Sequence, residues 1–101
     1  MREVLGVLGH QVGLVQGIGA EINLVFPLGS HMQDIPRLVD AQPEDAALLG
    51  HLLLTANKVA KQLGVGDAFR LAVNNGADAG QSVFHLHLHI LAGRAFKWPP
   101  G

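Results

Sequence analysis

The sequence predicts an α+β protein in which an antiparallel sheet packs on one main helix. Apolar residues recur at three- and four-residue steps across residues 43–63, which is typical of an amphipathic helix. Apolar residues alternate with other residues over 68–73 and again over 84–91, as expected for half-buried strands. Because a turn-rich stretch, residues 74–80, separates these two strands, we expect them to form a hairpin. The length of 101 residues suits a single domain with one core.

The start of the chain lacks these patterns. Residues 4–20 contain no Lys, Arg, Asp or Glu, and glycine recurs every fourth residue from Gly9 to Gly17. We expect an irregular or weakly ordered segment, with a replacement strand of the sheet and a targeting segment as the alternatives. A membrane span is not expected, because the uncharged run is shorter than the roughly 20 apolar residues that a span needs, and His10 and Gln11 interrupt it.

The main helix carries recognisable signals at both ends. Pro43 suits a first helical position, Glu44 and Asp45 complement the positive end of the helix dipole, and Gly64 follows as a stop. The spacing predicts one buried stripe along this helix. Its members are Leu49, Leu52, Leu53, Ala56, Ala60 and Leu63. His51 also falls within the helix, where we expect a surface or packing role.

Three histidines occupy every second position of the last expected strand, because residues 85–91 read His-Leu-His-Leu-His-Ile-Leu. Side chains alternate across a strand, so His85, His87 and His89 should share one face while Phe84 and the intervening apolar residues share the other. Core packing does not call for three imidazoles in line, because each buried imidazole needs a hydrogen-bonding partner. Neutral imidazole is a nucleophile and a proton carrier near neutral pH. The row therefore indicates phosphoryl chemistry or a zinc site, with three surface histidines as the plain alternative.

The surroundings of the row favour phosphoryl chemistry. The glycine-containing turn at residues 74–82 could direct backbone N–H groups and the Ser82 hydroxyl at an anion. A zinc site has no support from cysteine or from a His-Glu-x-x-His helix, and we expect neither a metal nor a cofactor. The net charge of −1 gives no electrostatic case for binding nucleic acid or an anionic membrane. The absence of cysteine agrees with a reducing compartment, and we expect a cytoplasmic location.

These segments together resemble the Hint branch of the histidine triad (HIT) family. The resemblance consists of the motif His-φ-His-φ-His-φ-φ (φ apolar) at residues 85–91, Asn-Asn-Gly at 74–76, Gly-Gln-Ser-Val-Phe at 80–84, and Trp-Pro-Pro-Gly at 98–101. It reaches back through the helix to about residue 35 and covers about two thirds of the chain. Two positions depart from the family pattern: Ala92 stands where relatives usually carry glycine, and Phe84 replaces a frequent tyrosine.

The resemblance implies a HIT-like domain at residues 34–101, preceded by a divergent, glycine-rich segment at residues 1–33. Relatives begin with strands that supply a ribose-binding aspartate and a further histidine, and residues 1–33 show neither clearly. Residues 22–27 faintly resemble the apolar strand that precedes the helix in relatives. The expected fold is therefore HIT-like but incomplete at the amino terminus, as if the first strands were truncated and replaced.

The resemblance also implies a hydrolase that cleaves the P–N bond of purine nucleoside phosphoramidates and releases the nucleoside monophosphate. His87 would be the nucleophile that carries a nucleotidyl intermediate, with His85 and His89 as its flanking partners. Ser82 would hydrogen-bond the phosphate and the leaving amine. The expected substrate-binding residues are Asn74, Gly80, Ser82, His89 and Trp98. Relatives of this branch are homodimers, and Trp98 would approach the substrate in the partner's site.

Several of these assignments have structural alternatives. Asn74 and Gly80 could be turn residues, since Asn and Gly tolerate positive φ. Ser82 could be a turn hydroxyl, and Trp98 a packing anchor for the proline tail. The alternative function is a purine-nucleotide-binding or dimerising interaction protein with little or no turnover, because the amino-terminal strands are missing.

Overall fold

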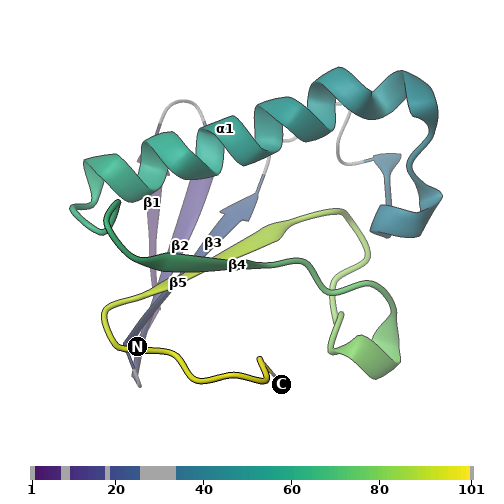
Figure 1. Cartoon of the computed structure of the whole chain (residues 1–101). Helices are drawn as coiled ribbons and strands as arrows, with labels where there is room; N and C mark the ends of the chain where they lie inside the picture. The colour runs from purple at the N-terminus through teal and green to yellow at the C-terminus, as the bar shows by residue number, and fades with distance from the viewer. Residues whose placement is uncertain (1, 8–9, 18, 26–33, 101) are drawn as a thin grey trace.

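An antiparallel five-stranded sheet and one long helix make up the described part of the protein in a computed structural model. The structure describes residues 2–7, 10–17, 19–25 and 34–100, with side chains described from residue 34 onward. The strands are β1 (Arg2–Val7), β2 (His10–Gly17), β3 (Gly19–Val25), β4 (Phe69–Ala72) and β5 (Leu88–Ala92). The helix is α1 (Ala46–Gln62), and the described part of the chain also contains the short 3₁₀ turns η2 (Leu38–Asp40), η3 (Pro43–Asp45) and η4 (Ala77–Ala79). The strand order is β1-β2-β3-β5-β4, and α1 lies across one face of the sheet (Figure 1). The predicted α+β fold is confirmed.

Strand β5 has a neighbour on each side. It pairs antiparallel with β4, where Ala72 lies opposite His89, so the predicted hairpin is confirmed. On its other side it pairs antiparallel with β3, where Asn23 lies opposite His89 and Ile22 opposite Ile90. A strand paired on both sides has both rows of its backbone N–H and C=O groups engaged, which favours a fixed conformation.

The expectation of an irregular segment at residues 1–33 is wrong for the part that the structure describes. Strands β1, β2 and β3 form there and extend the sheet from β5, which agrees with the alternative of replacement strands. The sequence analysis did not favour these strands, because their frequent glycines and uncharged runs do not show a clear two-residue period. Residues 26–33 lie outside the described residues. The division of the chain at residue 33 remains a prediction.

The helix starts one turn later than its sequence signals suggest. Pro43 opens the 3₁₀ turn η3, in which the Asp45 carboxylate accepts a hydrogen bond from the Gln42 N–H at 2.8 Å, and α1 continues from there. At the other end Gly64 adopts a positive φ of 76°, and the Val65 N–H donates to the Ala60 carbonyl at 2.9 Å. This is the expected glycine stop. Within the described residues, no helix has the length and apolar character that crossing a bilayer demands.

The core lies between α1 and the face of the sheet that Leu88 and Ile90 occupy. Its buried residues are Ile35, Leu52, Ala56, Val59, Leu86, Leu88 and Ile90. The predicted helical stripe is correct for Leu52, Ala56 and Ala60 but wrong for Leu53 and Leu63, which are 54% and 38% exposed. Leu53 lies at the edge of the stripe, where it lines an apolar groove of about 240 Å³.

The helix offers a matched pair of leucines for testing this core. Leu52 is 3% exposed and Leu54 is 63% exposed. Leu52→Ala should lower the free energy of unfolding by about 2–5 kcal/mol, because it removes buried methyl groups and leaves a cavity. Leu54→Ala should change it by less than about 0.5 kcal/mol. Urea denaturation of both variants measures the difference, and equal losses would mean that the exposed side of α1 is covered in solution.

Candidate active site

The histidine row occupies the face of β5 that points away from the core. Leu86, Leu88 and Ile90 are at most 2% exposed, whereas the three alternating histidines are half-buried. Only His89 lies within β5 itself, because the strand begins at Leu88. The alternation extends further, since the Leu86 N–H donates to the Ile35 carbonyl at 2.7 Å and ties the preceding segment to the core.

The predicted alternation fails at Phe84. This side chain is 51% exposed and does not join the buried leucines. The chain bends at Val83 and at His85, on either side of Phe84, so the two-residue alternation of the strand does not extend to Phe84. The usable row therefore starts at His85.

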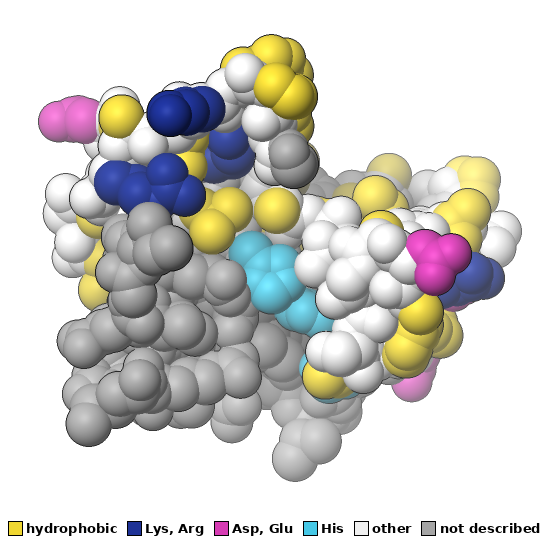
Figure 2. All heavy atoms as spheres, turned by 90° about the horizontal axis from the view of Figure 1, so that it is seen from below, with side chains coloured by type: hydrophobic (Ala, Val, Ile, Leu, Met, Phe, Trp, Pro, Cys, Tyr) yellow, Lys and Arg dark blue, Asp and Glu magenta, His cyan; other side chains and the backbone are white. Residues whose placement is uncertain are grey.

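The three imidazoles contact one another edge to face. The ring centroids of His85 and His87 are 5.9 Å apart with an interplanar angle of 60°, and those of His87 and His89 are 5.0 Å apart at 70°. This arrangement places His87 between two rings, as the sequence predicted. Figure 2 shows histidine side chains side by side at the surface of this face, and most of the Lys and Arg side chains visible in this view lie to the upper left of them.

A backbone contact fixes the protonation pattern of His87. Its Nδ1 lies 2.9 Å from the carbonyl oxygen of His85. Because a carbonyl can only accept a hydrogen bond, Nδ1 must carry the proton, and the lone pair of the neutral ring is then on Nε2. The local fold thus selects the tautomer in which Nε2 can act as a nucleophile or a base.

Asn74 and Gly80 lie together in the turn before the row. A Cβ placed on Gly80 would lie 3.5 Å from Asn74 Nδ2, which is ordinary contact, so space does not demand glycine here. The backbone does demand it, since the φ of Gly80 is 96° and that of Gly76 is 90°. The structure therefore accounts for Gly80 as a turn residue, whether or not it also lines a phosphate subsite.

Three backbone N–H groups of this turn are engaged within the turn itself. The N–H groups of Ala79 and Gln81 both donate to the Gly76 carbonyl at 3.1 Å, and that of Gly80 donates to Ala77 at 3.0 Å. These three groups are satisfied within the turn and are not available to an anion. Ser82, immediately after the turn, is exposed. Its hydroxyl stays the predicted donor in this stretch.

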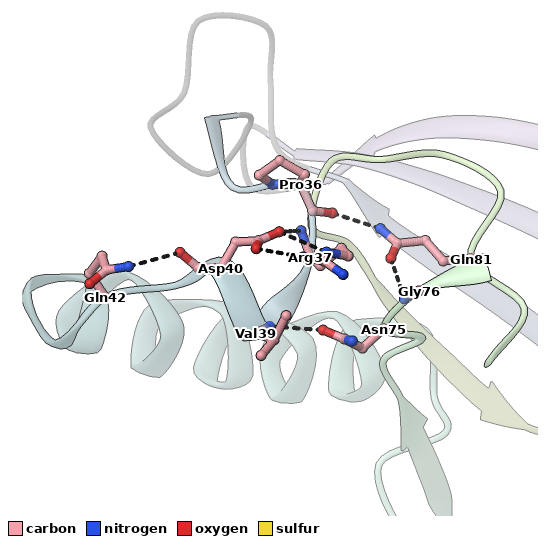
Figure 3. Close-up of polar contacts among 8 residues, drawn as sticks. All are labelled: Pro36, Arg37, Val39, Asp40, Gln42, Asn75, Gly76 and Gln81. Carbon is pink, nitrogen blue, oxygen red and sulfur yellow. Dashed lines mark hydrogen bonds and ion pairs between the residues drawn. The ribbon is translucent and has the colours of Figure 1, made fainter. Parts of the chain in front are cut away.

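Gln81 is the site-forming residue that sequence reasoning did not single out. Its side chain is 5% exposed, and its Oε1 accepts a hydrogen bond from the Gly76 N–H at 2.8 Å. Its Nε2 donates to the Pro36 carbonyl at 2.7 Å and to the Val83 carbonyl at 3.0 Å. Figure 3 shows the amide between the segment before the helix and the glycine turn. Gln81 thereby joins the turn, the start of the histidine segment and the segment that precedes the helix.

A second contact joins the same segments near the surface. Asn75 Oδ1 accepts a hydrogen bond from the Val39 N–H at 2.8 Å (Figure 3). Next to it, the Arg37 guanidinium and the Asp40 carboxylate form an exposed ion pair at 3.0 Å. Hydrogen bonds from Arg37 hold the pKa of Asp40 below its usual value. The ionised carboxylate thus favours the folded state, and this contribution is lost as the pH falls through the lowered pKa.

Trp98 is highly exposed. Its side chain is 80% exposed, and the Arg70 guanidinium carbon lies 5.7 Å from its ring centroid. The segment after β5 folds back beneath β4 on the side away from α1 (Figure 1). Among the described residues, no group of three or more His, Asp or Glu side chains is placed to hold a metal ion.

A small antiparallel α+β fold with three alternating imidazoles in line along β5 and the segment before it defines a protein of the histidine-triad class. The comparison with known families agrees, because the HIT domain model matches residues 23–96. The chain belongs to the HIT domain family. This match begins within β3 and includes the turn, Gln81 and the histidine row.

The chain is similar to two uncharacterised HIT-like proteins of cyanobacteria. It is 69% identical to the one from Synechocystis sp. over 67 residues, which are 66% of this chain and 59% of that protein. It is 49% identical to the one from Synechococcus elongatus over 69 residues, which are 68% of this chain and 60% of that protein. The chain thus spans about three fifths of the length of these relatives.

Solved structures of HIT proteins share the fold. A HIT family hydrolase from Legionella pneumophila superposes with a TM-score of 0.77 and 28% identity, covering 100% of this chain and 89% of that one. A histidine triad protein from Clostridium difficile gives a TM-score of 0.72 and 27% identity, covering 96% and 84%. The chain therefore has the fold of HIT family hydrolases.

The role of Gln81 can be tested by removing its amide. Gln81→Ala should lower the free energy of unfolding by about 1–3 kcal/mol, because polar groups that it satisfies would lose their partner. Gln62→Ala is the matched control, since Gln62 is exposed at the end of α1 and should change stability by less than about 0.5 kcal/mol. Chemical denaturation of both variants provides the comparison. A loss no larger for Gln81 than for Gln62 would show that the turn does not depend on this amide.

Proposed function

We propose that this protein is a nucleotidyl hydrolase that cleaves the P–N bond of purine nucleoside phosphoramidates through an intermediate on His87. The observation that carries the proposal is the hydrogen bond from His87 Nδ1 to the His85 carbonyl at 2.9 Å. It leaves the Nε2 lone pair for attack. Membership of the HIT family and the hydrolase fold add support.

In the first step, His87 Nε2 would attack the α-phosphorus and form a P–N bond to the ring. The bond to the leaving nitrogen breaks, and this nitrogen takes up a proton and departs as an amine. The ring gains positive charge as it bonds to phosphorus, and the His85 carbonyl, which accepts the Nδ1 proton, stabilises that charge. In the second step, water attacks phosphorus, the P–Nε2 bond breaks, and the nucleoside monophosphate is released.

The neighbours of His87 would hold the phosphate. His85 and His89 flank the reacting ring at 5.9 and 5.0 Å, close enough to contact oxygens of a group bound to Nε2. The exposed Ser82 hydroxyl would hydrogen-bond the phosphate and the leaving amine, and Asn74 and Gly80, which lie together in the turn, would line the phosphate subsite. Donors that meet developing charge in such sites contribute several kcal/mol to catalysis.

We propose that the protein acts as a homodimer in the cytoplasm, with no nucleic acid or membrane partner. Strand β4 lies at the edge of the sheet, where one row of backbone groups is available for pairing. Leu53 on α1 is 54% exposed, and Val39 is 65% exposed. A second copy would cover such apolar residues at a two-fold interface.

The covalent step can be tested with two histidine variants. His87→Ala should abolish turnover of an adenosine phosphoramidate and the trapping of labelled nucleotide on the protein, because no other ring has the same central position. His51→Ala is the matched control, since His51 is exposed on α1 and should leave both measurements unchanged. Quenched-flow mass spectrometry of the parent protein locates the adduct.

An adduct on His85 or His89, or full activity of His87→Ala, would contradict this mechanism. Tight binding of the monophosphate without any turnover in the parent protein would instead support the alternative function, a nucleotide-binding or interaction protein.

The dimer can be tested by light scattering of the purified protein at micromolar concentration. The measured mass should be twice the chain mass of 10.7 kDa, because a monomer would leave the Leu53 and Val39 side chains exposed. A folded monomer at this concentration would remove the proposal.

A further inference from the structure

Arg70 connects the sheet to the carboxyl-terminal segment through three contacts. Arg70 lies on β4 opposite Leu91, and directly opposed residues of an antiparallel pair share a face. Leu91 is two residues from His89 on β5, so Arg70 is on the same face of the sheet as His89. Its Nη1 donates to the Lys97 carbonyl at 3.1 Å. Its guanidinium carbon also lies 4.9 Å from the Phe96 ring centroid and 5.7 Å from that of Trp98.

These contacts constrain a segment that has few other anchors among the described residues. A guanidinium is planar, so it can stack on aromatic rings while its edge donates hydrogen bonds. Arg70 uses both properties, since it contacts two rings and the carbonyl between them in the sequence. Arg94 contacts Phe96 at 4.8 Å in a similar way, but its Nη1 donates to the carbonyl of its neighbour Ala95. Arg70 is thus the link from the strand to Trp98.

We infer that Arg70 is a positioning residue that holds the exposed Trp98 ring in one orientation, ready to contact the planar base or leaving group of the substrate. This inference rests on the proposed function for the identity of the substrate. An indole that is 80% exposed contributes little to a core, whereas a pre-oriented ring loses little entropy when it stacks on a ligand. Arg70 itself need not touch the substrate.

The sequence provides a clean optical test, because Trp98 is the only tryptophan and the chain has no tyrosine. Arg70→Gln should lower the steady-state fluorescence anisotropy of Trp98 and raise its quenching by acrylamide about twofold, since the ring would move more freely. Arg94→Gln is the matched control: it loses a similar contact with Phe96 but should change both signals much less. This measurement needs neither substrate nor turnover.

The substrate part is tested by a double-mutant cycle with an adenosine phosphoramidate, or with adenosine monophosphate binding if turnover is absent. Arg70→Gln should raise KM or Kd about twofold to fivefold, in line with the loss of one cation–π contact, with little change in kcat. In a Trp98→Ala background the same substitution should have no further effect, because Arg70 acts through Trp98. Arg70→Lys should raise KM or Kd less than Arg70→Gln does, since lysine keeps the positive charge but lacks the planar guanidinium.

The outcomes separate this inference from the proposed function. Unchanged anisotropy in Arg70→Gln would overturn the positioning role even in an active enzyme. If Arg70→Gln lowers the anisotropy but leaves KM and Kd normal, the link from Arg70 through Trp98 to the substrate is overturned. The same follows if Arg70→Gln still raises KM or Kd in the Trp98→Ala background. Failure of the nucleotidyl mechanism would appear in the His87 adduct experiment and would leave the anisotropy result intact.

Discussion

The buried amide of Gln81 joins three segments that the candidate site needs in fixed relation. It reaches the glycine turn through Gly76, the segment before the helix through Pro36, and the start of the histidine segment through Val83. A buried amide with its donors and acceptor satisfied is rigid, because each broken hydrogen bond would leave a desolvated polar group. The position of Ser82, the next residue, depends directly on this arrangement.

The chemistry of the row depends on a different and more local constraint. Leu86, Leu88 and Ile90 are held in the core, so the residues between them must face outward. This packing sets the spacing of the imidazoles, while the His85 carbonyl sets the proton position on His87. The core thus determines where the rings are, and the backbone determines which nitrogen can react.

The sequence predicted the hairpin, the helix and the histidine row because each depends on a short-range period. Its errors have physical causes. Phe84 is exposed because two bends end the alternation, and Leu53 is exposed because it lies at the edge of the helical stripe. Strand β3 was missed because its pairing with β5 joins distant parts of the sequence, and local propensity does not report such pairing. Strands β1 and β2 were missed because their glycines and uncharged runs show no clear two-residue period.

Two of the contacts described above were beyond sequence reasoning. Gln81 stands in a recognisable motif, yet nothing in the local pattern shows that its amide is buried rather than solvated. The one sequence signal for this role is its position directly after Gly80, at the end of the glycine-containing turn. The contact from Arg70 to Lys97 spans 27 positions, so no local pattern could reveal it.

The alternation along residues 85–90 also bears on how this protein can change. Inserting or deleting one residue between Leu86 and Ile90 would move the following side chains to the opposite face. Imidazoles would then enter the apolar core and leucines would enter the opposite face, so the core would lose its packing and the proposed site would lose its imidazoles together. A substitution therefore changes one side chain of this segment at a time, whereas a change in its length moves every following side chain to the opposite face.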